Sequence, residues 1–200
     1  MSASPAGSVV GSVLGTVVRL QVQRSPLKQR PSGSGPYDPG PLLEVPALQV
    51  GPGGCVGLVE GARVVDVHCA DHPQTRHVRG ANGLSVLPVA HYARLRATYG
   101  PHLVDGSAGE NLLLDAGPLT AADLAGTLLL ETDEGVVQAT GALAAPPCVE
   151  FAQHATGRPP GDLGEQVMAA LEDLDHGVRG FYLRVSGTGT VRAGARLLRA

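Results

Sequence analysis

The chain has 200 residues and a mass of 20.4 kDa, which favours one domain on a prior of about 150 residues per domain. Glycine (28) and proline (16) are abundant, yet 43% of residues are hydrophobic and 16% are charged, which excludes intrinsic disorder and argues against a helix bundle. The net charge of −3 provides no basic surface for phosphates, which excludes nucleic acid as the main partner.

Residues 1–8 are small and polar and are predicted to form a flexible tail before a single domain over residues 9–200. Residues 1–18 carry no charge, but Ser, Gly and Pro interrupt them and no basic residue precedes them. We therefore predict neither a signal peptide nor a membrane span, and expect a cytoplasmic protein with no membrane partner. Lys28 is the only lysine beside 14 arginines, a bias typical of GC-rich coding, so we expect a bacterial source.

The first half of the domain is predicted to consist of strands and one long loop. β-Branched residues at near-alternate positions predict a strand over residues 11–23. Repeated prolines and glycines predict a surface loop over residues 24–41, the kind of segment that often carries function. Short strands broken by Pro and Gly are predicted within residues 42–58, and a further strand over residues 61–68.

The second half contains the helical patterns. Apolar spacing predicts a helix over residues 86–99, with Pro88 in its first turn and Gly100 just past its end. A second helix is predicted over residues 163–174. Further strands are predicted over residues 111–114, 128–132, 136–143, 180–185 and 190–198. This pattern favours a mainly β fold, a closed or nearly closed β-barrel with a few peripheral helices, over a parallel α/β sheet.

A cluster of metal-binding residue types follows the strand predicted at residues 61–68. It contains His68, Cys69, Asp71, His72 and His77. If the strand continues, neighbouring side chains point to opposite faces, so the whole cluster cannot converge on one zinc ion. A polar loop, of which one member touches a ligand, is the preferred interpretation. Phosphate loops of the dinucleotide or Walker type are not present in the sequence.

The three cysteines are Cys55, Cys69 and Cys148, whose wide spacing predicts no disulfide framework. Cys148 ends the segment Ala-Ala-Pro-Pro-Cys after a predicted strand. The two prolines hold the backbone extended, so the cysteine is presented at a rigid strand end. Its thiolate is suited to bind a transition metal or to act as a sulfur nucleophile, and a buried, inert cysteine is the alternative.

Two other short motifs contain polar side chains suited to bind a ligand. Gly109, Glu110 and Asn111 begin a Gly-Glu-Asn-Leu motif, in which the two polar residues either orient a ligand or close the turn. Arg179 precedes Gly180, and its guanidinium either binds a phosphate or carboxylate or forms an ordinary surface ion pair.

The order of these motifs resembles that of the MOSC domain, the module named after the C-terminal part of molybdenum cofactor sulfurase. The matching features run from about residue 10 to the end of the chain: a Gly-x-Val strand at 11–20, Ser-Pro-x-Lys at 25–28, Gly-Glu-Asn-Leu at 109–112, Pro-Cys at 147–148 and Arg-Gly-x-Tyr at 179–182. The family stretch Gly-Leu-x-Gly-Asp-x-His differs here, because Gly-Leu-Val-Glu-Gly runs on to Asp66 and His68. The equivalence of Asp66 and His68 to family site residues therefore stays open.

The resemblance implies a β-barrel of complex topology and a set of site residues. Cys148 matches the family cysteine that ligates molybdenum or carries sulfur, and is expected to be both metal ligand and catalytic residue. Glu110 and Asn111 are expected to shape the catalytic site. The expected binding residues for the molybdenum–pterin cofactor are Lys28, Gly109, Arg179 and His68.

Family members that bind this cofactor reduce N-hydroxylated compounds such as hydroxylaminopurines and amidoximes. The resemblance therefore implies a reductase of such small molecules, with an electron-donor protein as a partner. The alternative is a sulfur-carrier or cofactor-binding module that holds a persulfide on Cys148 for a partner enzyme. A barrel with a decayed site is a third interpretation. The pyridoxal-phosphate domain of the sulfurase does not fit within 200 residues.

Overall fold

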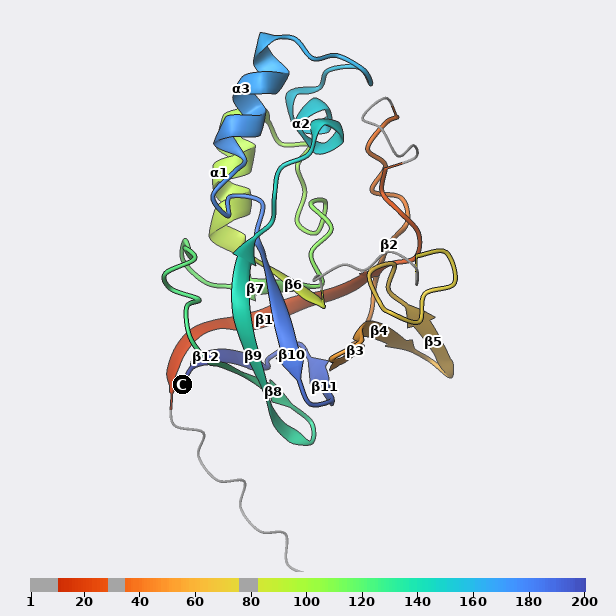
Figure 1. Cartoon of the computed structure of the whole chain (residues 1–200), viewed down its shortest axis with the longest axis vertical. Coiled ribbons are helices and arrows are strands. Elements are labelled where there is room, and N and C mark those ends of the chain that lie inside the picture. The colour runs from red at the N-terminus through yellow and green to blue at the C-terminus, as the bar shows by residue number, and fades with distance from the viewer. Residues whose placement is uncertain (1–10, 29–34, 76–82) are drawn as a thin grey trace, which may run out of the picture.

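The computed structural model describes residues 11–28, 35–75 and 83–200. Its main feature is a closed barrel in which the strands follow the order β12-β8-β9-β10-β6-β7-β1, and β12 pairs with β1 to close it (Figure 1). The strands are β1 (Ser12–Gln23), β6 (Leu84–Pro88), β7 (Leu112–Asp115), β8 (Leu128–Thr132), β9 (Gly135–Ala144), β10 (Phe181–Ser186) and β12 (Arg196–Arg199). The predicted mainly β, closed barrel is confirmed. Strands β6 and β7 are parallel, and the other neighbours are antiparallel.

Strand β1 is long enough to pair with three partners in turn. It pairs with β12 near its start, with β7 along its middle and with β2 (Leu42–Glu44) at its end. Register shifts after Val13 and Val17 accommodate these changes of partner. Alternate residues of the strands face an apolar interior, and its fully buried members include Leu84, Val86, Leu112, Leu114, Leu128, Leu130, Phe181 and Leu183. Burial of this surface is the main term that stabilises the barrel.

A second, four-stranded sheet packs beside the barrel in the order β11-β3-β4-β5. Its strands are β3 (Ala47–Gly51), β4 (Gly54–Val59), β5 (Ala62–Val65) and β11 (Gly189–Arg192). The prediction of one strand over residues 190–198 is wrong, because a turn at Gly194 (φ 93°) separates β11 from β12 and the two strands lie in different sheets. The strand predicted over residues 61–68 ends at Val65.

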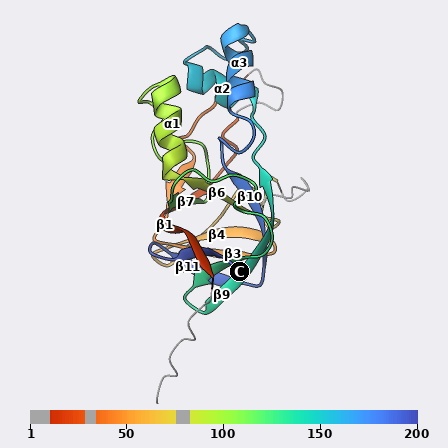
Figure 2. The same cartoon turned by 90° about the vertical axis from the view of Figure 1, so that its left-hand side faces the viewer.

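Three helices gather at one end of the barrel (Figures 1 and 2). They are α1 (Val89–Tyr99), α2 (Val149–Thr156) and α3 (Glu165–Asp173), and they pack around an apolar cluster that includes Tyr92, Leu95, Phe151, Val167 and Leu174. No helix in the described part of the chain is long and apolar enough to cross a membrane.

The helix predicted over residues 86–99 begins later than expected, at Val89. Residues 84–88 form β6 instead, and Pro88 is the extended N-cap residue of the helix. Helix α2 is absent from the sequence prediction. Three predicted features lie wholly or partly outside the described residues: the tail at residues 1–8, part of the loop at residues 24–41, and His77.

Candidate functional site

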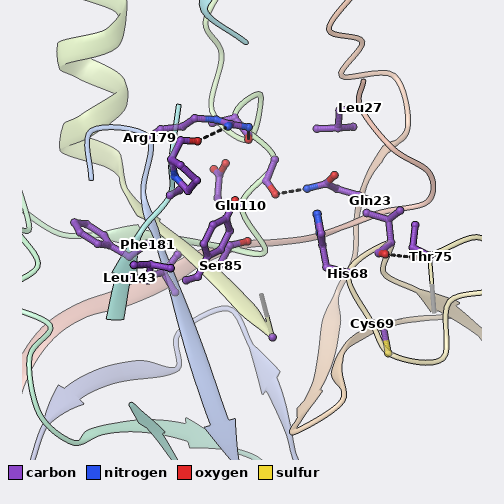
Figure 3. Close-up of a pocket in the computed structure, with 18 of the residues that line it drawn as sticks. Gln23, Leu27, His68, Cys69, Thr75, Ser85, Glu110, Leu143, Arg179 and Phe181 are labelled. Atoms are coloured by element: carbon purple, nitrogen blue, oxygen red, sulfur yellow. Dashed lines mark hydrogen bonds between the residues drawn. The ribbon is translucent and has the colours of Figure 1, made fainter. Parts of the chain in front are cut away.

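A cavity of about 960 Å³ lies between the barrel and the segments that connect its strands (Figure 3). Figure 3 shows Arg179 and Glu110 close together, with Leu143 and Phe181 on one side and His68 and Thr75 on the other. The ionisable side chains in its lining include Lys28, His68, Cys69, Glu110, Cys148, Arg179 and Arg184. Its size is that of a cofactor or small-molecule site, and it gathers three permanent cations in a chain of net charge −3.

Cys148 lies in the wall of this cavity and is half-buried. It was predicted at a rigid strand end, and its backbone is extended (φ −131°, ψ 151°), but it is also the N-cap residue of α2. Nη1 of Arg179 lies 3.5 Å from its Sγ. The Arg179 guanidinium therefore places a positive charge beside the Cys148 sulfur.

Arg179 is held in place by contacts from several directions. Nη1 also donates to Pro146 O (3.3 Å), and Nη2 donates to Ala108 O (3.5 Å). The guanidinium stacks over the Phe151 ring at 4.8 Å from its centroid. Burial lowers the pKa of Arg179, but the ionisable groups around it, Cys148 first among them, more than offset this and raise the pKa, so the side chain stays charged. Its Nε is buried and has no partner among the described residues.

Glu110 presents a buried carboxyl group to the cavity and is only 4% exposed. Its Oε2 accepts a hydrogen bond from the Tyr92 hydroxyl (2.9 Å), which in turn accepts one from Ala108 N (2.8 Å). Oε1 has no partner among the described residues. Burial raises the pKa of Glu110 to about 7, so this group can give or take a proton near neutral pH.

Asn111 lies behind the cavity wall and is not among the lining residues. Its Nδ2 donates to Gln21 O (3.2 Å) and Asp66 Oδ2 (3.1 Å), while its Oδ1 accepts from both N and Oγ of Ser85 (3.0 and 2.9 Å). With these bonds it braces the strands around the site. A catalytic role for Asn111 stays a prediction. In the structure its side chain contacts other residues of the protein and does not line the cavity.

Asp66 and His68 form a pair at the edge of the cavity. Asp66 is 1% exposed and accepts hydrogen bonds from Gln23 N (2.8 Å) and His68 N (2.8 Å). Its Oδ1 also lies 3.2 Å from Nδ1 of His68. Because a carboxylate can only accept, Nδ1 carries the proton, which leaves Nε2 of His68 for a ligand. The sequence left both residues open, and the structure puts His68 in the lining with Asp66 behind it.

Lys28 and Gly109 lie along the same wall. Nζ of Lys28 is 3.7 Å from Glu150 Oε2, and its side chain is 45% exposed. Gly109 has a φ of 88° and its carbonyl accepts a hydrogen bond from Gln23 Nε2 (2.7 Å). A Cβ at this position would lie 2.8 Å from Leu27 Cδ1, so the close approach requires glycine. Of the seven predicted site residues, all but Asn111 therefore line one cavity.

The described residues of the His- and Cys-containing cluster after β5 do not form a zinc site. The ring of His72 lies within hydrogen-bonding distance of Arg24 O, just after β1 (3.3 Å), and of Thr75 Oγ1 in its own loop (3.1 Å). Within residues 11–28, 35–75 and 83–200, no three His, Cys, Asp or Glu side chains are placed to hold a metal ion. Cys69 lies in the cavity lining.

Several lining residues are not among the predicted site residues, Tyr37, Tyr182 and Arg184 among them, although Tyr182 ends the Arg-Gly-x-Tyr motif. Tyr37 lies in the loop predicted to carry function, and its hydroxyl donates to Ser107 O (2.8 Å). Burial raises its pKa, so the phenol stays protonated. Tyr182 and Arg184 occupy alternate positions of a strand, and that alternation was the only signal that they face away from the barrel interior.

The profile of the MOSC domain family matches residues 73–197. Among solved structures, the chain is similar to the YuaD protein from Bacillus subtilis, with 12% identity and a TM-score of 0.54 over 92% of this chain and 93% of that chain. It is also similar to a hypothetical protein (15%, 0.53, 92% and 68%) and to YiiM from Escherichia coli (18%, 0.50, 78% and 63%). At these identities the likeness shows the fold alone. No curated protein matches the chain in sequence.

Proposed function

Because the chain belongs to the MOSC domain family, which is associated with molybdenum cofactor binding, we propose that its cavity binds a molybdenum–pterin cofactor and supports two-electron reduction of an N-hydroxylated small molecule. The observation that carries this proposal is the placement of Cys148 and Arg179, 3.5 Å apart, in one cavity with Lys28 and Glu110.

The residues of the cavity fit such a cofactor. A thiolate is a soft ligand suited to molybdenum, and Cys148 supplies one beside the sulfur ligands that the pterin brings. A phosphate group requires charged or N–H donors, which the lining residues Lys28 and Arg179 supply. Among the described residues no three His, Cys, Asp or Glu side chains are placed to hold a bare ion, so the donor set suits a group that carries its own ligands.

When bound, a molybdenum–pterin cofactor would supply the exchange of two electrons. Cys148 would hold the metal, and the charge of Arg179 would compensate that of the sulfur. Reduction of an N–OH group to N–H consumes two electrons and two protons and releases water. Glu110 holds one of these protons close to neutral pH, and an electron-donor protein supplies the electrons. Replacing Glu110 with Gln would lower turnover roughly 100-fold or more while the metal content stays unchanged.

The proposal is tested by expression in a host that makes the cofactor, followed by measurement of molybdenum, pterin and amidoxime turnover. Cys148→Ser should lose most of the molybdenum and all measurable turnover. Cys55→Ser is the matched control, because Cys55 is buried outside the cavity lining and its thiol donates to Gly83 O (3.1 Å), as a hydroxyl also can. A wild-type protein without molybdenum and pterin, or a Cys148→Ser variant indistinguishable from it, refutes the proposal.

A sulfur carrier is the second candidate, because the positive charge of Arg179 beside Cys148 would also stabilise a persulfide. Mass spectrometry of the intact protein separates the two functions. A reducible adduct of ~32 Da on Cys148 supports the carrier, whereas bound cofactor with turnover of an N-hydroxylated compound supports the reductase.

A further inference from the structure

Strand β10 presents two polar side chains to the cavity at alternate positions. Leu183 faces the barrel interior and is fully buried, whereas Tyr182 on one side of it is half-buried and Arg184 on the other is exposed. Both polar residues line the cavity. Figure 1 shows β10 running away from the helices toward β11, so Arg184 lies farther than Tyr182 from the α2 end, where Cys148 is found, by roughly 7 Å along the strand.

Arg184 differs from every other arginine in the described part of the chain. The others each donate to at least one acceptor of the protein: Arg19, Arg24, Arg63, Arg94, Arg96, Arg158, Arg179, Arg192, Arg196 and Arg199. Arg184 makes no such bond with the described residues. The Tyr182 hydroxyl is likewise without one, although the hydroxyls of Tyr37, Tyr92 and Tyr99 all donate. Two donors without a partner among the described residues therefore line the same cavity from one strand.

The chemistry of these two donors selects an anion. A guanidinium offers a planar fork of N–H groups that matches the oxygens of a carboxylate or phosphate, and a phenol adds one O–H donor. The other permanent cations of the lining, Lys28 and Arg179, are the proposed partners of the cofactor phosphate, so Arg184 remains for an anionic group of the substrate. Beside Tyr182 in the ladder stands Leu143, which is 56% exposed and provides apolar surface for the body of a ligand.

We propose that Arg184 and Tyr182 form an anion-binding subsite of the cavity, with Arg184 farther than Tyr182 from Cys148, and that they select substrates that carry a carboxylate or phosphate group apart from their N-hydroxyl group. This subsite rests on the proposed function, because it names the substrate class of the same cavity. Its ligand is the charged substituent of the substrate, and not the phosphate of the cofactor.

The test uses three aryl amidoximes that share one scaffold: a neutral compound, its carboxylate derivative and its phosphonate derivative. Their dissociation constants are measured by calorimetry on the purified protein, whose molybdenum and pterin contents are determined in parallel. Wild-type protein should bind an anionic derivative at least tenfold more tightly than the neutral compound. Arg184→Gln should abolish that preference, and Tyr182→Phe should reduce it by roughly fivefold.

The matched control is Arg63→Gln, which removes the same charge from an exposed arginine outside the lining that donates to Gln49 Oε1. Arg63→Gln should keep the full preference for the anionic compounds. If the preference came only from the net charge of the protein, Arg63→Gln and Arg184→Gln would reduce it equally. The proposal is overturned if wild-type protein does not distinguish the three compounds. It is also overturned if Arg184→Gln lowers the pterin content, because Arg184 then belongs to the cofactor site. If the protein holds no cofactor and Arg184→Gln still removes the preference, the subsite stands and the proposed reduction fails.

Discussion

The interior of the barrel and the wall of the cavity share strand β10 but differ in how their polar groups are paired. On β10, Leu183 faces the interior with no exposed surface, while Tyr182 and Arg184 line the cavity together with the buried Phe181. Of the described buried side-chain nitrogen and oxygen atoms that have no partner, only Arg199 Nε lies on a barrel strand. Glu110 Oε1 and Arg179 Nε, in contrast, belong to the cavity lining.

This difference indicates that the barrel interior mainly stabilises the fold, whereas the cavity wall holds the groups suited to bind a ligand. The barrel interior gains stability from apolar burial, which needs no ligand. The cavity wall keeps desolvated polar atoms unpaired, which reduces stability unless a ligand satisfies them. Changes in the interior should therefore lower the free energy of unfolding at every pH, whereas changes in the wall should alter ligand binding and have smaller or pH-dependent effects on unfolding.

The largest effect on stability is expected from Leu114→Ala in the barrel interior. Leu114 is fully buried and lies opposite Val17 in the β1–β7 ladder. Removing its methyl groups should lower the free energy of unfolding by roughly 2–5 kcal/mol. Chemical denaturation would measure this loss. Leu163→Ala, at a position that is 61% exposed, should change stability by less than about 0.5 kcal/mol. Equal losses in the two variants would contradict a stabilising role for the interior.

A somewhat smaller effect is expected from Glu110→Gln, and it depends on pH. Burial raises the pKa of Glu110 from 4.5 to about 7, so the folded protein keeps a proton that the unfolded chain releases between those pH values. The free energy of unfolding should therefore fall as the pH rises through this window, by about 3 kcal/mol from this group. Glutamine does not titrate, so the variant should lack this decrease.

Denaturation at pH 5 and pH 8 would measure the decrease in both proteins. Exposed Glu60 provides the control, because Glu60→Gln should leave the wild-type pH dependence in place. A Glu110→Gln variant that loses stability with pH as steeply as the wild-type protein would show that the cavity carboxyl does not bind the proton.

The smallest effect is the expected difference in stability between Gly109→Ala and Gly126→Ala. Both glycines have nearly the same φ (88° and 87°), so both variants carry a backbone cost of about 1–2 kcal/mol. A Cβ at Gly126 meets no atom within 4 Å, whereas one at Gly109 lies 2.8 Å from Leu27 and 2.9 Å from Gln23 Nε2.

Gly109→Ala should therefore cost roughly 1 kcal/mol more than Gly126→Ala, because Gln23 must move and its bond to the Gly109 carbonyl is lost. Urea denaturation of both variants gives the difference. Equal losses of stability in the two variants would show that the residues around Gly109 are not closely packed.

Local alternation in the sequence predicted much of the barrel. The strands predicted over residues 11–23 and 128–132 correspond to β1 (Ser12–Gln23) and β8 (Leu128–Thr132). Helix α2 escaped prediction because it has only eight residues and follows two prolines. Strand β6 escaped because its apolar residues continue into the pattern of α1, so the two periods could not be separated.

The candidate site could be predicted in its residue types and only partly in its assembly. The soft thiol of Cys148, the carboxyl of Glu110 and the fork of Arg179 were recognised from their motifs. Asn111 belongs to the same motif as Glu110, but strand alternation turns it toward Asp66 and Ser85 behind the wall. Arg184 carried no motif, since an exposed arginine on a strand has the same local pattern whether or not a cavity lies beside it.

Strands and reactive residue types follow from the order of side chains along the chain, because alternation, turns and side-chain chemistry are local properties. The meeting of Lys28, Glu110, Cys148 and Arg179 in one cavity is not local. It depends on closure of β12 against β1 and on the helices that pack at one end of the barrel. Burial in the folded chain raises the pKa of Glu110. The tertiary structure also places Arg184 in the cavity lining without a partner among the described residues.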